Sequence, residues 1–417
     1  MFGEQNKSML KIAVNLAVIF VVIFLIVIFF FGNKNNTGST GTPSKTTAGK
    51  NASKDLVPIV VLDSIVRSAD AGESFEKYFK VATSSKIGNA DVLSIVFHPL
   101  IRDRVFVTTY QDGIFLNEKR VNSWTKIDFP PKKIYSFILD NSSPDNRIFA
   151  SGVVEENGRI FRTDDGGNKW RVVYAEPGLN SLVSALAQYP KNPKLIIAGT
   201  SMGTIVKSFD RGDTWKNVGQ KIDGRISNFD FDSTKQFTYM LSYQSKIYFS
   251  TDEGSTWKNW EDEKAKEVAA LNSQANALAG KQDSAGADAL RKQAAALQKR
   301  NNENRQPGGV INIVTDPTKS GIIYAGTTNG LYRSKDYGKY WNKLNIIESA
   351  EKFPIKSVAI SPKNSNEIVF VSGRSFYKSI NNGDTWAVVP VNNSINAVFV
   401  AYDPFDPKII FIGLSRI

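Results

Sequence analysis

Cysteine is absent from this 417-residue chain, and His98 is its only histidine. The first absence excludes disulfides, thiolate metal ligands and a lipid-modified cysteine, although it leaves the cellular compartment open. The second excludes metal sites built from several histidines and argues against a catalytic triad of serine, histidine and aspartate. No glycine-rich phosphate-binding loop follows a strand and opens a helix. These absences narrow the possible chemistry before any motif is considered.

His98 is itself interpreted as a turn residue. It stands before proline in FHPLI, a place that related segments fill with Tyr189, Asp316, Ser361 and Asp403. The stretch TDDGGN from Thr163 resembles a calcium-binding loop in sequence, but it lacks the terminal glutamate that such a loop needs. We therefore predict no metal site and no cofactor.

The one long apolar run lies near the N-terminus, from Ile12 to Phe31, with Asn15 as its single polar interruption. A helix of that length is about 30 Å long, enough to span a bilayer. No small-residue cleavage site follows the run, so residues 12–31 are predicted to be an uncleaved transmembrane anchor after a short lead of residues 1–11. Residues 32–55 are polar and predict a disordered tether with an r.m.s. span of roughly 25 Å.

The charges on either side of the apolar run do not decide the direction in which it would cross the membrane. Lysines lie on both sides of the apolar run, at Lys7 and Lys11 before it and at Lys34, Lys45 and Lys50 after it. A short lead and a large downstream domain favour placing that domain on the extracytoplasmic side. The net charge of +12 is spread along the chain, so we interpret it as a source of solubility and expect no nucleic-acid partner.

A repeated eight-residue pattern dominates residues 56–417: Ser or Thr, then Asp two places on, Gly two further on, and Trp three after that. Short alternating runs flank each copy, which is typical of a β-hairpin. Asp and the leading hydroxyl can accept turn N–H groups, Gly supplies an unusual backbone conformation, and Trp should be buried between sheets. The copies, two of them looser, are Ser68, Asp70, Gly72 and Phe75; Thr163, Asp165, Gly167 and Trp170; Ser208, Asp210, Gly212 and Trp215; Ser250, Asp252, Gly254 and Trp257; Ser334, Asp336, Gly338 and Trp341; Ser379, Asn381, Gly383 and Trp386.

A second kind of hairpin precedes every copy but the first, and counting both kinds gives seven units if NEKRVNSW, ending at Trp124, is a decayed copy. The first copy, at Ser68, has no such hairpin before it, and the last hairpin, ending near Gly413, has no copy after it. We therefore predict a seven-bladed β-propeller of four-stranded sheets. Its ends should share one blade, with the C-terminal strands inside and residues 58–78 outside.

At this point the chain resembles the Asp-box, or BNR-repeat, propellers. That family includes sialidases, two-propeller xyloglucanases, sortilin-type receptors and photosystem II assembly-factor propellers. The resemblance implies an all-β fold whose boxes are structural and lie away from the usual ligand face. It does not fix a function.

One interval between boxes contains an insertion, residues 261–306, without a strand pattern. Two series share a spacing of three, four and three around a breaker cluster at Gly280 to Gly286, namely Val268, Leu271, Ala275 and Leu278, then Ala287, Leu290, Ala294 and Leu297. This pattern predicts an antiparallel helical hairpin. Propeller topology leads us to expect it on the face opposite the boxes.

An enzymatic function has less support from the sequence than a binding function. The early sialidase motif is missing, and xyloglucanases use two acidic residues in a cleft between two propellers, whereas this chain predicts one. Sortilin-type receptors carry Cys-rich modules, which a chain without cysteine lacks. Asp112, Glu155 and Glu156 lie on one class of loop and could converge as paired carboxylates, so a glycan-binding or glycan-cleaving propeller is the alternative.

We interpret the chain as a membrane-anchored, extracytoplasmic and non-enzymatic propeller that binds a protein, such as a member of a membrane complex, as an assembly factor or scaffold would. The candidate partner-binding face consists of loops between second and third strands. Its predicted residues are Tyr110, Gln111, Asp112, Glu155, Asn157, Met202, Gln244, Asn329 and Arg374.

Overall fold

The computed structural model describes residues 64–78, 90–118, 124–232, 234, 237–242, 246–346, 354–391 and 395–416. All of them belong to the second of the two units into which the chain divides, Met1–Ile59 and Val60–Ile417. The anchor and tether predicted for residues 12–31 and 32–55 lie outside the described residues. Within the described ranges, neither helix is long and apolar enough to cross a membrane.

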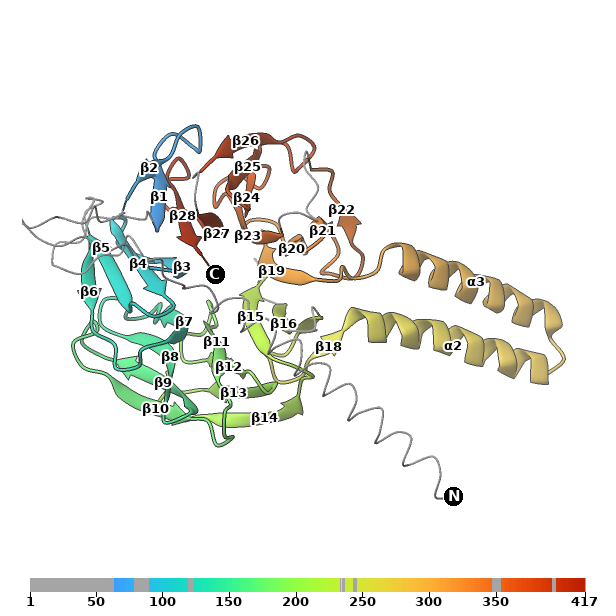
Figure 1. The fold of residues 1–417 in the computed structure, drawn as a ribbon. Coiled ribbons are helices and arrows are strands. Elements are labelled where there is room, and N and C mark those ends of the chain that lie inside the picture. The colour runs from blue at the N-terminus through green and yellow to red at the C-terminus, as the bar shows by residue number, and fades with distance from the viewer. Residues whose placement is uncertain are drawn as a thin grey trace, which may run out of the picture. The chain divides into compact units, whose positions relative to one another are not determined.

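Seven antiparallel four-stranded sheets surround a common axis as the blades of a propeller, so the all-β prediction is confirmed (Figure 1). Blade 1 contains β3 (Val92–Phe97), β4 (Arg104–Thr109), β5 (Ile114–Glu118) and β6 (Thr125–Ile127). Blade 2 contains β7 (Ile134–Leu139), β8 (Ile148–Val154), β9 (Asn157–Thr163) and β10 (Arg171–Ala175). Blade 3 contains β11 (Val183–Gln188), β12 (Ile196–Thr200), β13 (Thr204–Ser208) and β14 (Lys216–Lys221).

The remaining blades follow the same order from the axis outward. Blade 4 contains β15 (Ile226–Phe231), β16 (Thr238–Ser242), β17 (Ile247–Ser250) and β18 (Lys258–Asn259). Blade 5 contains β19 (Val310–Thr315), β20 (Ile323–Thr327), β21 (Gly330–Ser334) and β22 (Asn342–Lys343). Blade 6 contains β23 (Ile355–Ile360), β24 (Ile368–Ser372), β25 (Ser375–Ser379) and β26 (Ala387–Pro390).

Blade 7 closes the ring with strands from both ends of the chain. Its order is β2 (Glu76–Lys77), β1 (Ile65–Ser68), β28 (Ile410–Ser415) and β27 (Asn396–Tyr402). Ile65 pairs with Gly413 and Ser68 with Ile410, so the C-terminal strands are the inner pair. The predicted closure is confirmed, and it removes the exposed edge that an open ring would present.

The apolar cores lie between neighbouring blades. One cluster joins Ile197 and Ile205 of blade 3 to Phe229, Met240 and Trp257 of blade 4. Each strand contributes alternate residues to such a cluster because successive side chains point to opposite faces of a sheet. Burial between sheets therefore fixes the spacing of the blades around the ring.

Each box is a turn closed by its own side chains. In blade 3 the Ser208 hydroxyl accepts the Gly212 N–H at 2.7 Å and donates to Asp210 Oδ1 at 2.8 Å. Asp210 in turn accepts the Thr214 N–H at 2.8 Å. Gly212 has φ +79, and a Cβ there would lie 2.5 Å from the Phe149 ring of blade 2. Glycine is thus required twice, by the left-handed backbone and by the packing of the next blade.

The box tryptophans differ in burial, which corrects the expectation that all are enclosed between blades. Trp257, Trp341 and Trp386 are buried, as is Trp124 of the decayed copy. Trp170 and Trp215 are only half-buried. They cover the outer part of the preceding blade: the Trp170 ring lies 5.0 Å from that of Phe129, and the Trp215 ring lies 5.9 Å from that of Tyr174.

Replacing Asp210 by alanine should lower the free energy of unfolding by about 1–2 kcal/mol, because turn N–H groups lose their acceptor. Asp210→Asn should cost less, since Asn381 makes the equivalent bond to the Thr385 N–H at 2.9 Å in blade 6. Burial opposes ionisation of Asp210, but hydrogen bonds from Thr214 and Ser208 outweigh it and lower its pKa to about 2. Because this pKa lies below that of an unfolded aspartate, the carboxylate stabilises the fold above about pH 4 and loses that effect as the pH falls toward 2.

Chemical denaturation of both variants at pH 7 and at pH 3 checks this prediction. The gap between the parent and Asp210→Asn should narrow in acid. A gap that is the same at both pH values would contradict the role assigned to the carboxylate.

The insertion forms the predicted helical hairpin, α2 (Trp260–Gly280) and α3 (Ser284–Glu303). Asn259 caps α2 by accepting the Glu261 N–H at 2.8 Å, and Asp283 caps α3 by accepting the Gly286 N–H at 2.9 Å. The seam is narrow: Ala275, Ala287 and Ala294 are buried, whereas the leucines of both predicted series are half-buried. Figure 1 shows the pair leaving the ring at its rim, between β18 and β19.

Candidate functional site

The turns between second and third strands form the face opposite the boxes, because successive turns of an antiparallel blade alternate between its two ends. Eight of the nine residues predicted for the partner-binding face lie on five such turns, and Gln244 lies outside the described residues. They are Tyr110, Gln111 and Asp112 (β4–β5), Glu155 and Asn157 (β8–β9), Met202 (β12–β13), Asn329 (β20–β21) and Arg374 (β24–β25).

Three of these turns are each closed by a threonine that the sequence analysis did not single out. The Thr109 hydroxyl donates to the Gly113 carbonyl at 2.9 Å, and that of Thr327 donates to the Gly330 carbonyl at 2.8 Å. The Thr200 hydroxyl accepts the Thr204 N–H at 3.0 Å. All three threonines are fully buried. The sequence signal was present, since each is the last residue of its second strand.

Side chains on this face are of mixed character. Glu155 has φ +52 and pairs with Arg159 at 3.1 Å, so it is held on its own hairpin. Tyr110 is half-buried, with the Lys133 ammonium 5.2 Å from its ring centre. Met202 is 53% exposed, and Leu179, in the neighbouring β10–β11 connection, is 74% exposed. Exposed apolar side chains beside polar ones are typical of protein-binding surfaces.

Both ends of the described chain reach the same face. β28 runs toward it, and the Leu414 N–H donates to the Ser64 carbonyl at 2.8 Å. The Arg416 N–H donates to Asp91 Oδ1 at 2.8 Å, just before β3. The chain therefore enters blade 7 at the face opposite the boxes.

The hairpin does not share that face at its base, contrary to the sequence-based expectation. β18 has only two residues, so α2 starts while the chain is still close to the box turn. The Trp260 ring stacks 4.3 Å from that of Phe249, and its Nε1 donates to the Tyr337 carbonyl at 2.8 Å. Trp260, the one tryptophan outside the box pattern, thus joins blade 4 to the box turn of blade 5.

Tyr340, in the same box turn, fixes the hairpin further. Its ring lies 4.2 Å from the Arg300 guanidinium and 5.3 Å from the Lys264 ammonium. Its hydroxyl donates to Asn301 Oδ1 at 3.1 Å. Lys339 pairs with Glu267 at 2.8 Å. Cation–π contacts of this kind strengthen when they are shielded from water, so both helices are held against blade 5.

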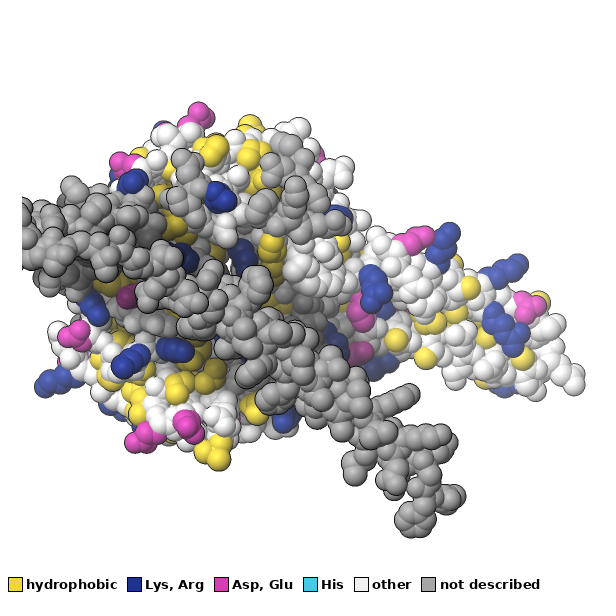
Figure 2. All heavy atoms as spheres, viewed as in Figure 1, with side chains coloured by type: hydrophobic (Ala, Val, Ile, Leu, Met, Phe, Trp, Pro, Cys, Tyr) yellow, Lys and Arg dark blue, Asp and Glu magenta, His cyan; other side chains and the backbone are white. Residues whose placement is uncertain are grey.

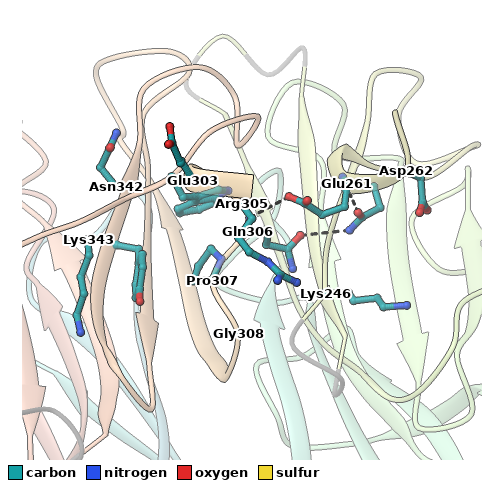
Figure 3. Close-up of a pocket in the computed structure, with 13 residues that line it drawn as sticks. Lys246, Glu261, Asp262, Glu303, Arg305, Gln306, Pro307, Gly308, Asn342 and Lys343 are labelled. Atoms are coloured by element: carbon teal, nitrogen blue, oxygen red, sulfur yellow. Dashed lines mark hydrogen bonds between the residues drawn. The ribbon is translucent and has the colours of Figure 1, made fainter. Parts of the chain in front are cut away.

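A groove of about 770 Å³ runs along the rim between blades 4 and 5, next to the base of the hairpin (Figure 3). One wall comes from the start of the hairpin and the other from β21 and β22, while residues 305–308 cross between them. The lining residues are Lys246, Asn259, Glu261, Asp262, Glu303, Arg305, Gln306, Pro307, Gly308, Tyr332, Trp341, Asn342 and Lys343.

The charges of this groove are separated along its length. Figure 3 shows the carboxylates of Asp262 and Glu303 toward one end and the ammonium groups of Lys246 and Lys343 toward the other. Along the hairpin itself, by contrast, Figure 2 shows charges of both signs mixed with small apolar patches. Charges of opposite sign are therefore separated in the groove, whereas they are mixed along the hairpin.

Two carboxylates with shifted pKa values serve as links between blades. Burial raises the pKa of Asp230 to about 6, against the effect of hydrogen bonds from the N–H groups of Thr315 and Phe231. Asp232 accepts the Gly321 N–H at 2.8 Å, and its hydrogen bonds outweigh burial and lower its pKa. Both carboxylates accept backbone N–H groups of blade 5, Asp230 from β15 and Asp232 from the position after β15, so both serve to hold blade 4 against blade 5.

His98 is confirmed as a turn residue. Its Nδ1 accepts the N–H groups of Leu100 at 3.2 Å and Ile101 at 2.8 Å, and the side chain is fully buried. Burial also lowers its pKa. Among the described residues, no cluster of three or more His, Asp or Glu side chains is arranged to hold a metal ion.

Comparison with known proteins confirms the resemblance to Asp-box propellers. The family described as photosynthesis system II assembly factor YCF48 matches residues 151–352. A curated relative, a probable oligoxyloglucan-reducing end-specific xyloglucanase from Neosartorya fischeri, is 25% identical over 215 residues. That alignment covers 46% of this chain and 26% of the enzyme, so the chain matches about a quarter of that relative's length.

Solved structures show the same fold at low sequence identity. The GH74 xyloglucanase from Xanthomonas campestris has a TM-score of 0.59 and 17% identity, with 79% of this chain and 51% of that chain covered. A structure of YCF48 bound to D1 peptide has a TM-score of 0.55 and 13% identity, with 82% of this chain and 96% of that chain covered. This chain thus spans almost the whole of one relative and about half of the other.

Proposed function

We propose that this chain is a membrane-anchored, extracytoplasmic propeller that binds another protein as an assembly factor or scaffold, without catalysis. The family match carries the proposal, because the matched family is described as an assembly factor and the match, over residues 151–352, extends from blade 2 through blade 5 and includes the hairpin. The similar structure of YCF48 was solved with a D1 peptide bound, which provides a precedent for a propeller of this fold that holds a segment of another protein.

The described surface supports the proposal. Ser64, where the described chain enters blade 7, lies at the face opposite the boxes. The exposed Met202 and Leu179 lie on that face, beside polar turn residues from other blades.

Chemical crosslinking of the full chain in its native membranes tests this function. The expected result is one protein, captured in amounts comparable to the chain, with its contacts mapped to the turns between second and third strands. Contacts spread evenly over both faces would contradict a specific binding role.

The orientation is tested separately by adding protease to intact cells or spheroplasts. Cleavage in residues 32–55 should release the propeller, because a polar tether offers exposed backbone whereas the blades are packed and hydrogen-bonded. Full protection until the membrane is permeabilised would place the propeller on the cytoplasmic side.

A carbohydrate-active propeller is the second candidate, supported by the 25% identity to the curated xyloglucanase. Xyloglucan oligosaccharides incubated with the full chain distinguish the two functions. Release of new reducing ends that scales with protein concentration would favour this candidate. No release, together with capture of a protein partner, would favour the binding role.

A further inference from the structure

The groove between blades 4 and 5 lies where the outer strands of both blades are short. β18 and β22 contain two residues each, whereas β14, the outer strand of blade 3, contains six. After the short β18 the chain continues into the hairpin and then into the segment that returns from the hairpin to β19. A volume of about 770 Å³ remains open, within the range of ligand-binding sites.

One wall of the groove is a strand edge that is only partly paired. In β22, Asn342 and Lys343 pair with Arg333 and Tyr332 of β21, and the Leu344 N–H donates to the Leu331 carbonyl at 2.8 Å. Backbone groups of successive residues in a strand point to opposite sides, so those of Lys343 point away from β21.

The segment after α3 begins to pair with this edge and then leaves it. The Trp341 N–H donates to the Asn304 carbonyl at 3.3 Å, on the side away from β21. Beyond Asn304 the chain turns toward β19, and the next outward-facing position, Lys343, lines the groove. An extended segment of another chain could continue the pairing from this point, as in strand addition.

The basic end of the groove has no acidic partner of its own. Lys246, Arg305 and Lys343 line it, and none of the three forms an ion pair with another residue in the ranges that the structure describes. At the other end, by contrast, Glu261 forms an ion pair with Lys264 at 2.7 Å and accepts the Gln306 N–H at 2.9 Å. The charge beside the open strand edge is therefore positive, whereas the carboxylates of Asp262 and Glu303 lie at the other end of the groove.

We propose that this groove binds an extended segment of the partner protein, with Asp or Glu side chains of that segment against Lys246, Arg305 and Lys343. Main-chain bonds to β22 would supply affinity, and the paired charges would set register and rate of association. This inference rests on the proposed protein-binding function and adds the place and the chemistry of one contact.

The test places the photo-crosslinker p-benzoyl-L-phenylalanine at Asn342 of the full chain, followed by irradiation of native membranes. The expected product is a crosslink to one segment of the partner that carries acidic residues within a few positions of the attachment point. In the double variant Lys246→Glu and Lys343→Glu its yield should fall about tenfold, because attraction becomes repulsion.

A matched control carries Lys194→Glu and Lys408→Glu, two exposed lysines on box-face turns with the same change in net charge. Its crosslink yield should equal that of the parent. Equal losses in both double variants, or a crosslinked segment without acidic residues, would overturn the groove proposal. If a crosslinker at Met202 captures a partner but one at Asn342 does not, the groove is wrong and the binding function stands; if the full chain captures nothing, both fail.

Discussion

Trp257→Ala is expected to lower the free energy of unfolding by about 3–5 kcal/mol, the cost of deleting a large buried aromatic side chain. Trp257 is 4% exposed and packs in the cluster that joins blades 3 and 4, with its ring 5.8 Å from that of Phe229. Because neighbouring blades share each core, the cavity would weaken two sheets at once.

Trp170→Ala is the matched control for this prediction. Trp170 occupies the same place in its box but is half-buried, so its replacement removes less buried apolar surface and leaves a smaller cavity. Urea unfolding of both variants measures the difference. Equal and small losses would mean that the boxes do not hold the blades together through their tryptophans.

Replacing residues 261–306 by a short Gly/Ser bridge is expected to leave the propeller folded but to abolish most of its partner capture. The ends of the insertion lie side by side, since the Asn259 amide donates to Gln306 Oε1 at 3.2 Å, so a short bridge can span them. The hairpin seam buries few side chains and contributes no strand to a blade. The deletion does remove Glu261, Asp262, Glu303, Arg305 and Gln306 from the groove.

The deletion is measured by a thermal melt and by crosslinking in membranes. Tm should drop by only a few degrees, because every blade keeps its four strands and the cores between blades, whereas the lost contacts join the hairpin to the box turn of blade 5. Unchanged capture of the same partner would show that neither the hairpin nor the groove takes part in binding. Loss of the cooperative transition would show instead that the insertion is part of the core.

The fold could be predicted because its determinants are local and repeated. A box needs a hydroxyl, a carboxylate, a glycine and an aromatic residue at fixed spacing, and each turn makes its own hydrogen bonds. The shared blade could be predicted for the same reason, because the first box has no hairpin before it and the last hairpin has no box after it. Strand alternation then assigned the turns to two faces.

The position of the hairpin could not be predicted, because it depends on where one strand stops. A full-length β18 would have carried the chain across to the opposite face, but α2 begins at Trp260 and packs against the next box. The groove followed from that same early ending. It was missed because its lining comes from five separate stretches of the chain, and no local pattern brings Lys246 and Lys343 together.

The central claim is that one face of this propeller binds a protein, and a pair of exposed side chains tests it directly. Met202 is 53% exposed on the face opposite the boxes, and Phe209, between Ser208 and Asp210 in the box of the same blade, is 55% exposed. The measurement is the yield of crosslinked partner in membranes for Met202→Glu and for Phe209→Glu. The account predicts that the first variant loses most of its partner and that the second retains it, with equal thermal stability. Equal capture by both variants, or loss only in Phe209→Glu, would contradict it.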